Sequence, residues 1–484
     1  MARWRPWQVI VAMTALALLV RAIDFGNPVI HVDEQYYLLV GDRLWSGATP
    51  YLDIWDRKPI GLFLLYAAIR ALPGDGILAY QLVATGFAAT TALIVDRAAR
   101  RVGASPAGAV AAGAAYLVWL SALGGRGGQS PVFYNLFVAM AALVALHLPL
   151  RAAAGRQWAI LAWGAFACLL GGIAIQLKYT PAIEGVYIGI VHLVFLRRAG
   201  AGWRRVALAG LCWAACGLAP TLGAIVWYRL LGTQAFAAFW FANVTSIGLR
   251  AGYPADQLAM RLLGIGAILS PLIASAALGW RRRDWSPETA IAAGWIGAAL
   301  VGFLAIGTFF DHYALPLLAP LAVTAGEAFG RSPRLGVAML AIGLAVNGIA
   351  WEMRSDDAAG ARTVAALVQR NSTGRGCPYV FIGDTITYQL ARVCLPTAYA
   401  FPNLLAYTTE RGATGIDEAA EVRRILANRP PVIVTSDRRL SIWNPASLRL
   451  VKAALSADYR PVMATPRSGY RTIVYLRRDL ALRR

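Results

Sequence analysis

Residues 31–59 read HVDEQYYLLVGDRLWSGATPYLDIWDRKP and join two apolar segments of the chain. The stretch holds five acidic and three basic residues, together with large side chains such as Tyr36, Tyr37, Trp45, Tyr51 and Trp55. An ordinary loop between membrane helices would be polar throughout. The amphipathic pattern predicts that this stretch lies on a membrane surface, with its aromatic rings at the level of the lipid headgroups.

The composition decides the class of protein. Hydrophobic residues make up 58% of the 484 positions, which is too apolar for a soluble protein of this size. The formal net charge is +21, but the arginines occur in short clusters between apolar runs. Cytoplasmic loops of membrane proteins have this pattern, whereas a nucleic-acid-binding protein concentrates its charge on one soluble face. The chain is predicted to be a polytopic membrane protein that binds no nucleic acid.

Eleven apolar segments have roughly the length of about 17 to 25 residues that a membrane helix needs. They are residues 7–23, 76–95, 106–123, 131–150, 158–177, 181–196, 206–231, 258–279, 288–307, 311–329 and 335–351. Residues 60–72 are apolar but short, and we expect a second surface helix there. No convincing small-residue cleavage site follows the first segment, so we expect it to be a retained membrane helix.

Charge predicts the orientation. Arg3 and Arg5 precede the first segment, which places the N-terminus in the cytoplasm under the positive-inside rule. Every second loop then carries clustered arginines: Arg97, Arg100 and Arg101; Arg151 and Arg156; Arg197, Arg198, Arg204 and Arg205; Arg281, Arg282 and Arg283; Arg331 and Arg334. An odd number of spans places residues 31–59 and the C-terminal segment outside a bacterial inner (plasma) membrane.

The character of the chain changes after Trp351. Short β-rich runs at residues 379–382, 432–435 and 472–476 alternate with helical stretches at 361–370 and 417–427, which predicts a small α/β domain. We therefore expect a transmembrane catalytic domain at residues 1–351, including a first external loop at 24–75, and a periplasmic α/β domain at 352–484.

Candidate chemistry lies at both ends of the opening stretch. Asp33 and Glu34 are predicted to act as a general base or orienting carboxylate; the alternative is that they only cap a surface helix. Lys58, with Asp56 nearby, precedes an apolar helix and suits contact with a lipid phosphate; the alternative is a solvated turn. His31 could be a base or a ligand, but a single interfacial histidine is more often neither.

The order of an apolar helix, DE-x-x-Y at residues 33–37, and D-x-K-P at 56–59 before another apolar helix resembles the GT-C glycosyltransferases. It is most similar to glycosyltransferase family 39 in its broad bacterial sense, which includes lipid A aminoarabinose transferases and relatives of protein O-mannosyltransferases. The resemblance implies a polyprenyl-phosphate sugar donor, with Asp33 as catalytic residue, Glu34 beside it, and Lys58 at the donor phosphate.

Two further segments carry the resemblance. Asp311-His312-Tyr313 resembles the entry to a late span, which implies a site role for His312 and Tyr313. Gly383-Asp384 resembles the end of a strand in the external domain of the family, which brings in Asp384.

The chain also departs from the family. Lys58-Pro59 is followed by Ile60 where a second proline is usual. Arg57 precedes Lys58 where the aminoarabinose branch has an acid, so no cofactor is expected with certainty and a divalent cation stays open. The loop at 124–135 lacks the Asp that is often found in this region, and Gln129 or Asn135 could replace it.

Four other basic residues are secondary candidates for the donor phosphate: Arg57, Arg126, Lys178 and Arg250. For the last three, the alternative is that the side chains only reach toward lipid headgroups.

Cys377 and Cys394 lie in the predicted external domain, before a strand and after a short helical run. A strand that turns into a helix packed against it can bring such ends together, so a disulfide is predicted. The alternative is a pair of buried free thiols.

The sequence thus predicts an α-helical membrane enzyme that transfers a sugar from a polyprenyl-phosphate donor to a lipid, glycan or protein acceptor. A glycolipid transporter or flippase would carry charged residues in mid-span, and few are present. A non-catalytic assembly factor of surface-glycan synthesis is a third hypothesis, against which the presence of Asp33, Glu34, Asp56 and Lys58 argues.

Overall fold

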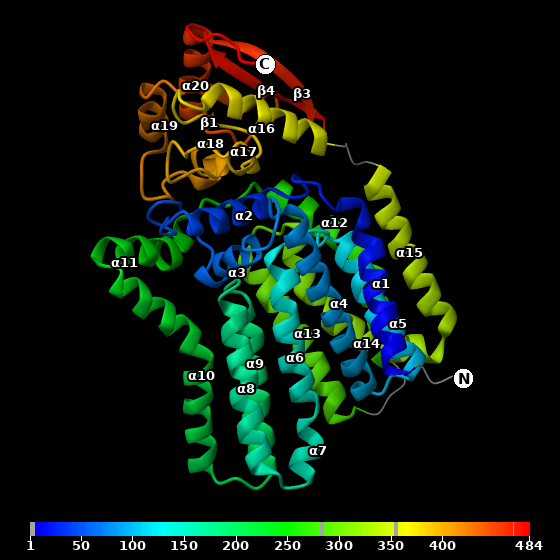
Figure 1. Cartoon of the computed structure of the whole chain (residues 1–484). Coiled ribbons are helices and arrows are strands. Elements are labelled where there is room, and N and C mark those ends of the chain that lie inside the picture. Colours follow the sequence, from blue (N-terminus) through cyan, green and yellow to red (C-terminus); the bar gives the residue numbers. More distant parts are fainter. Residues whose placement is uncertain (1–4, 281–284, 353–356, 468) are drawn as a thin grey trace. The chain divides into compact units, whose positions relative to one another are not determined.

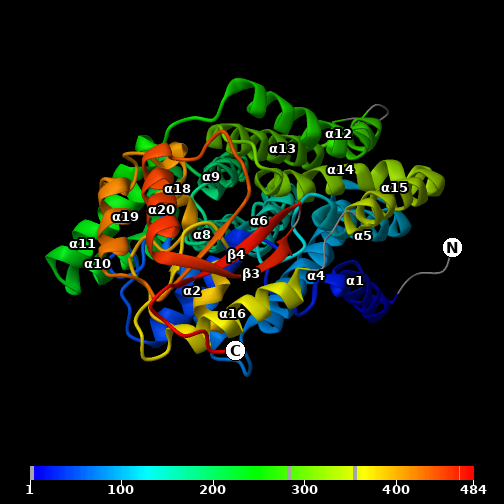
Figure 2. The ribbon, with the colours of Figure 1, turned by 90° about the horizontal axis from the view of Figure 1, so that it is seen from above.

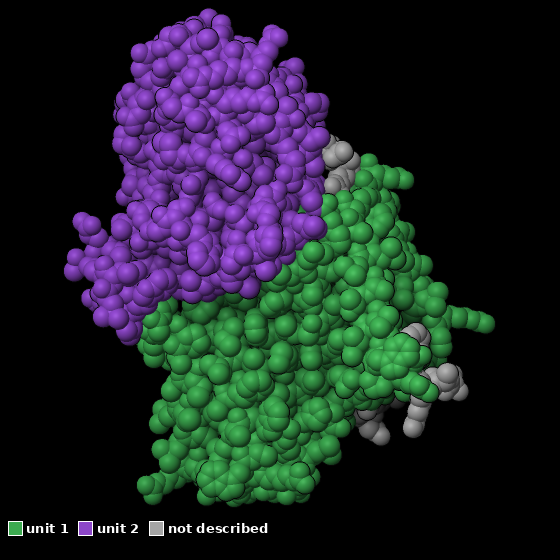
Figure 3. Space-filling model, viewed as in Figure 1, with its two compact units in different colours: residues 1–25, 81–224, 254–352 green, residues 26–80, 225–253, 353–484 purple. Residues whose placement is uncertain are grey.

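The computed structural model describes residues 5–280, 285–352, 357–467 and 469–484, and it divides into two compact units (Figures 1 and 3). Unit 1 is formed by residues 1–25, 81–224 and 254–352, and unit 2 by residues 26–80, 225–253 and 353–484. The first loop, which we expected to belong with the membrane helices, therefore groups with the C-terminal segment. Arg3, Arg281, Arg282 and Arg283 of the predicted topology lie outside the described residues.

Unit 1 is built from long apolar helices. They are α1 (Pro6–Arg21), α4 (Ile77–Val102), α5 (Pro106–Ala122), α6 (Ser130–Leu146), α7 (Leu148–Ala153), α8 (Gln157–Ile175), α9 (Pro181–Arg198), α10 (Trp203–Leu230), α12 (Ala255–Trp280), α13 (Pro287–Ile306), α14 (Leu318–Arg331) and α15 (Pro333–Glu352). Short 3-10 helices, η1 (Ala22–Asp24) and η4 (Asp311–Leu317), follow α1 and precede α14.

Each of the eleven predicted spans coincides with a helix. Nine helical segments of the described chain are long and apolar enough to cross a membrane, where α6 with α7 and η4 with α14 each count as one segment. The two others are α5, which has 17 residues, and α9, whose 18 residues include Glu184, Arg197 and Arg198. The prediction of a polytopic membrane protein with a small C-terminal domain is confirmed.

Small residues let the helices of unit 1 approach closely. α14 packs against α5 and α12, and the same helices lie together in Figure 1 and in the view from above in Figure 2. A Cβ atom added to Gly108 of α5 would stand 2.2 Å from the carbonyl oxygen of Gly326 in α14. Because lipid supplies little hydrophobic drive between helices, such close van der Waals packing stabilises the bundle.

In unit 2, α2 (Val32–Trp45) packs across α3 (Ile60–Arg70). Gly41 makes this crossing possible, since an added Cβ would lie 2.7 Å from the carbonyl carbon of Tyr66. The Trp45 indole donates a hydrogen bond to the Ala67 carbonyl (2.8 Å), and Arg70 pairs with Asp42 (2.9 Å). The two helices of the first loop therefore form one packed layer.

This packing corrects one expectation. Tyr36, Tyr37, Tyr51 and Trp55 are buried inside the protein, and only Trp45 is largely exposed. The rings contact other side chains: Tyr36 lies 5.0 Å from Phe401, and Tyr37 lies 5.5 Å from Tyr66, between ring centroids. The aromatic residues of the loop thus build a core and do not form a belt at the lipid headgroups.

The rest of unit 2 combines short helices with one mixed sheet. The helices are α11 (Thr233–Trp240), η2 (Phe241–Thr245), η3 (Ser246–Leu249), α16 (Ala358–Ser372), α17 (Ile386–Leu390), α18 (Pro402–Ala406), η5 (Thr408–Glu410), α19 (Glu418–Ala427) and α20 (Pro445–Asp458). The strands are β1 (Tyr379–Val380), β2 (Val432–Ser436), β3 (Tyr459–Arg467) and β4 (Tyr470–Arg477), in the order β1-β2-β4-β3.

Strand β3 was not predicted from the sequence. It contains Pro461 and Pro466 and pairs with β4 on one side only, in antiparallel register. An edge strand tolerates proline because it needs no hydrogen bonds on its outer side. The predicted strands at 379–382, 432–435 and 472–476 are confirmed as β1, β2 and β4, with β1 and β2 parallel.

The predicted disulfide is confirmed. The sulfur atoms of Cys377 and Cys394 are 2.01 Å apart, and their Cα atoms are 5.1 Å apart. The bridge joins Cys377, two residues before β1, to Cys394, four residues after α17. It closes a loop that contains Asp384.

Candidate active site

Asp33 lies in the first turn of α2, and His31 is the N-cap of this helix. His31 has extended backbone angles, and its Nδ1 accepts a hydrogen bond from the Asp33 backbone N–H (3.4 Å). The carboxylate of Asp33 lies 3.8 Å from the same ring nitrogen, with 19% of its side chain exposed. Asp33 and Glu34 both suit the positive end of the helix dipole. Glu34, in contrast, is fully buried.

Gln35 and Tyr36 of α2 connect the helix to other segments of unit 2 by hydrogen bonds. Gln35 is buried, and its amide donates a hydrogen bond to Asp384 (3.0 Å). The Tyr36 hydroxyl donates to the Trp55 carbonyl (2.8 Å), next to the loop that carries Asp56. Burial, with the charge of Asp56 in addition, raises the pKa of Tyr36 well above its usual value, so this phenol stays protonated.

Asp56 organises the turn that presents Lys58. Its Oδ1 accepts hydrogen bonds from the backbone N–H groups of Arg57 (2.5 Å) and Lys58 (3.2 Å), which is an Asx-turn. The same oxygen lies 3.9 Å from the Lys58 ammonium, whose side chain is 24% exposed. That ammonium also stands 5.3 Å from the centre of the Tyr37 ring. The turn thus holds a lysine that solvent can reach.

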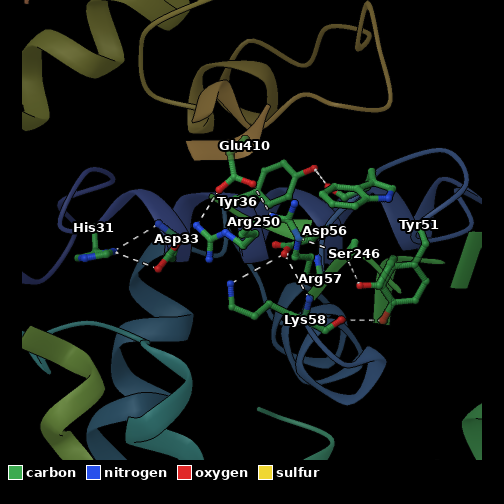
Figure 4. A network of polar contacts seen from close by, with 12 residues as sticks. His31, Asp33, Tyr36, Tyr51, Asp56, Arg57, Lys58, Ser246, Arg250 and Glu410 are labelled. Atoms are coloured by element: carbon green, nitrogen blue, oxygen red, sulfur yellow. Dashed lines mark hydrogen bonds and ion pairs between the residues drawn. The ribbon is translucent and has the colours of Figure 1, made fainter. Parts of the chain in front are cut away.

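Arg57 points elsewhere. Its guanidinium donates to Glu410 (2.6 Å), to the Ala413 carbonyl (3.0 Å) and to the Ser246 hydroxyl (3.2 Å). Arg250 donates to the other oxygen of Glu410 (2.7 Å), so one buried carboxylate holds two arginines. We call Arg57, Arg250 and Glu410 the Glu410 clamp (Figure 4). Burial lowers the pKa of Arg57, and the charge of Glu410 opposes that shift.

The predicted candidate Asp384 belongs to a second ion-pair cluster of unit 2. Arg467 of β3 donates two hydrogen bonds to Asp384 (3.1 and 3.0 Å) and pairs with Asp357. Burial alone would lower the pKa of Arg467, but the two carboxylates, chiefly Asp384, raise it above its ordinary value. Through Gln35, Asp384 also contacts α2. Its role in the structure is therefore to connect α2 with the sheet.

The other predicted residues lie in unit 1. Lys178 is buried, with its ammonium 3.8 Å from the centre of the Tyr313 ring. The His312 ring lies 4.4 Å from that of Tyr313, and its Nδ1 lies 3.4 Å from Asp311. Arg126 lies 3.9 Å from the buried carboxylate of Asp24. The fold thus brings Lys178, His312 and Tyr313 together although the first is more than a hundred residues before the others.

The loop at 124–135 contains Asn135, one of the two residues predicted to replace an Asp there. The amide of Asn135 donates hydrogen bonds to the Leu315 carbonyl (3.1 Å) and to the Tyr116 hydroxyl (3.4 Å). These contacts hold α6 against η4, so Asn135 is engaged in packing. Among the described residues, no group of three or more His, Cys, Asp and Glu side chains stands close enough to hold a metal ion.

The sequence reasoning missed Glu410 and Arg467. Glu410 is a single acid between Thr409 and Arg411, with no motif around it, and it meets Arg57 across 353 residues. Arg467 likewise reaches Asp357 over 110 residues. Residues that far apart carry no local signal in one sequence.

No protein-family model matches the sequence, and no curated protein matches it. In structure, the chain is similar to ArnT from Cupriavidus metallidurans bound to undecaprenyl phosphate, with a TM-score of 0.66, 15% identity and 99% of both chains covered. It is more distantly similar to the archaeal oligosaccharyltransferase AglB from Archaeoglobus fulgidus, in complex with an inhibitory peptide and a dolichol-phosphate (TM-score 0.49, 11% identity, 98% of this chain and 75% of that chain).

The similarity extends over essentially the whole chain, membrane helices and C-terminal segment together. It shows that this protein has the fold of the GT-C glycosyltransferases, and the resemblance inferred from the motifs is confirmed at the level of the fold.

Proposed function

We propose that this protein is a membrane glycosyltransferase that moves a sugar from a polyprenyl-phosphate donor to a lipid, glycan or protein acceptor. The observation that carries the proposal is the placement of Asp33 and Lys58. In unit 2 of a chain with the GT-C fold, the Asp33 carboxylate and the Lys58 ammonium lie near the two ends of residues 31–59. Both side chains are partly exposed. The ArnT structure with a bound polyprenyl phosphate supports a donor of that class.

The reaction needs a base for the acceptor. The acceptor oxygen attacks the anomeric carbon of the sugar, the bond from that carbon to the phosphate oxygen breaks, and the electron pair leaves with the polyprenyl phosphate. The configuration at the anomeric carbon is inverted. Asp33 takes the proton of the attacking hydroxyl, a contribution typically worth about 10²–10⁴-fold in rate. Its position in the first turn of α2, capped by His31, orients the carboxylate for this step.

The leaving phosphate needs a positive charge, which we assign to Lys58. The chain has 46 basic residues, and only Lys58, Lys178 and Lys452 among them are lysines. Arginine fits rigid, bidentate pairs, whereas the ammonium of lysine is a compact charge on a flexible stem that can follow a departing group. The Asx-turn of Asp56 aims Lys58, so Asp56 is a positioning residue in this proposal.

For Arg57 and Arg250 we propose a structural role in place of the predicted contact with the donor phosphate. Both are engaged by Glu410, and Arg57 also holds Ser246 and the Ala413 carbonyl. We therefore assign them to the Glu410 clamp, which fixes the residue before Lys58. Lys178 and Arg126 stay candidates for the donor phosphate in unit 1, with His312 and Tyr313 forming the surroundings of Lys178.

The proposed setting is the inner (plasma) membrane, with the N-terminus in the cytoplasm and the C-terminal segment outside. The arginine clusters at alternate helix ends support this orientation. Reporter fusions after Arg101, Arg156, Arg205 and Arg334 should report the cytoplasm, and a fusion after Trp351 should report the outside.

The decisive experiment uses the purified full-length protein with radiolabelled polyprenyl-phosphate sugars and membrane extracts as a source of acceptor. Comparison of surface glycans and lipids by mass spectrometry, with and without the gene, identifies the acceptor class. The proposal predicts release of polyprenyl phosphate by the wild-type protein and not by Asp33→Asn. Equal release by Asp33→Asn, or no loss of any glycan on deletion, would contradict it.

A further inference from the structure

One end of the helices of unit 1 carries a basic hollow that the proposed reaction does not use. It has a volume of about 390 Å³ and is lined by Arg97, Arg100, Arg101, Leu143 and His147. The three arginines stand in the last two turns of α4, Leu143 stands in the last turn of α6, and His147 caps the end of α6. α4 and the combined segment of α6 and α7 (Ser130–Ala153) are both long and apolar enough to cross a membrane.

Arg100 and Arg101 are held in orientation by acceptors on α4, α6 and α13, of which Asp96 and Leu146 are buried. Arg100 forms a bidentate pair with the buried carboxylate of Asp96 (2.9 and 2.8 Å). Arg101 donates to the Leu146 carbonyl at the end of α6 (3.2 Å) and to Glu288 in the first turn of α13 (2.9 Å). These contacts use the Nε and Nη2 groups of each guanidinium. Since a guanidinium has five N–H donors, both arginines keep donors for another acceptor.

Arg97 and His147 complete the lining. Arg97 lies 3.7 Å from Asp96, and 59% of its side chain is exposed. The His147 ring is held by a hydrogen bond between Nδ1 and the Leu143 carbonyl (2.9 Å), in which Nδ1 must be the donor. Three guanidinium groups meet the two carboxylates of Asp96 and Glu288, so the hollow has an excess of positive charge.

The geometry points to a binding site for an anionic phospholipid, and we propose that the phosphate of its headgroup occupies this hollow. Guanidinium groups with fixed orientation match the oxygens of a phosphate. The hollow lies at the last turns of α4 and near the end of α6, where we place the lipid phosphates, and Leu143 adds an apolar wall one turn before His147. Basic pockets between membrane helices on the cytoplasmic side bind such headgroups.

A lone arginine whose side chain reaches to the bilayer surface would not discriminate between lipid headgroups. This site differs because Asp96 is a buried charge within a membrane helix, and such a residue is costly unless it has a task. Here the task is to hold Arg100 in place. The site requires neither the sugar donor nor the acceptor, so it stands or falls independently of the proposed transfer reaction.

The test measures lipid binding to the full-length protein in neutral detergent by native mass spectrometry. Phosphatidylglycerol, phosphatidylcholine and inorganic phosphate are titrated separately. We expect phosphatidylglycerol to bind in preference to phosphatidylcholine, and Arg97→Gln to weaken it roughly tenfold, as for the loss of one charge-assisted contact. Arg100→Lys, which keeps the charge but not the bidentate geometry, should also weaken it.

Arg334→Gln is the matched control, because Arg334 is an exposed arginine near the start of α15, outside the hollow. It should bind phosphatidylglycerol as the wild type does. The proposal is overturned if the two lipids bind equally, if Arg97→Gln and Arg334→Gln have the same effect, or if inorganic phosphate alone competes as well as the lipid. Unchanged thermal unfolding of Arg97→Gln shows that a loss of binding is not a loss of fold.

Discussion

Two charged regions of unit 2 lie near the start of α2 and near the start of α3, and they are built differently. Around Arg467, two carboxylates and the Gln35 amide form short contacts, and 13% of the arginine side chain is exposed. Around Lys58, the contact between its ammonium and the Asp56 carboxylate spans 3.9 Å, and 24% of the lysine side chain is exposed. Short, buried pairs fix the fold, whereas a longer contact at a reachable lysine suits a group that meets a ligand. The Glu410 clamp resembles the first region and borders the second.

The largest effect is expected at Asp33. Asp33→Asn keeps the shape and the helix cap but removes the base, so transfer should fall about 10²–10⁴-fold while the melting temperature stays near that of the wild type. Asp53→Asn is the matched control, since Asp53 lies in the same loop and accepts only a hydrogen bond from the Thr49 backbone in the structure. Turnover assays of both proteins decide. Near-normal turnover in Asp33→Asn would contradict the assignment of Asp33 as the base.

Arg467→Met should act on stability. Removal of the arginine takes the Arg467 charge away from the buried carboxylates of Asp357 and Asp384, and the loss of one partner of a buried ion pair typically costs about 3–5 kcal/mol. Thermal unfolding of the full-length protein in detergent should show a clear fall in the midpoint. Arg471→Met is its control, because Arg471 pairs with Asp437 while 63% of its side chain is exposed. A midpoint that falls equally in both variants would show that burial does not distinguish these pairs.

The disulfide should contribute about 3 kcal/mol through the loop that it closes. Cys377→Ala/Cys394→Ala should therefore unfold at a lower temperature than the wild type, and reduction of the wild-type protein should have the same effect. Since the bridged loop contains Asp384, we expect the ion pairs of Arg467 to be the first contacts that the variant loses on heating. Cysteine alkylation before and after reduction checks the bridge. Labelling of both thiols without reduction would show that it does not form.

Lys58→Ala should raise the KM for the polyprenyl-phosphate donor roughly 10- to 100-fold, the range for loss of a hydrogen bond between charged groups. Its effect on the acceptor should be smaller. Lys58→Arg should restore the activity only in part, because a planar fork replaces a compact charge. Lys452→Ala, at an exposed lysine of α20, is the control. Unchanged donor KM with a lowered melting temperature would assign Lys58 to the fold.

The smallest effect concerns pH. A hydrogen bond from Arg424 lowers the pKa of Glu421, with the Thr397 hydroxyl in support and burial opposed. A carboxyl whose pKa is lower in the folded state stabilises the fold above the pKa of the unfolded chain, and the effect is lost as pH falls through the folded value. Glu421→Gln should therefore lower the melting temperature at neutral pH by an amount equivalent to about 1 kcal/mol or less. The difference from the wild type should vanish in acid.

Much of the fold follows from the sequence because it depends on local composition. Each apolar run became a helix, since lipid and core both require the backbone to pair internally. The short β-rich runs became β1, β2 and β4. Cys377 and Cys394 could be paired because only 17 positions separate them and a strand and a helix lie between. The edge strand β3 escaped prediction because its prolines oppose the usual pattern.

Asp33 and Lys58 could be singled out from one amphipathic stretch, because charged groups there stood beside apolar ones. The sequence by itself thus determined the membrane class, the helices and the candidate chemistry. Only the tertiary structure decided which charges are engaged: Arg57 and Arg250 with Glu410, and Arg467 with Asp357 and Asp384. The tertiary structure also buries most of the aromatic residues of the first loop in a core. The physical reason is that an ion pair or a packed ring depends on distance in space, and residues separated by hundreds of positions acquire that distance only when the chain has folded.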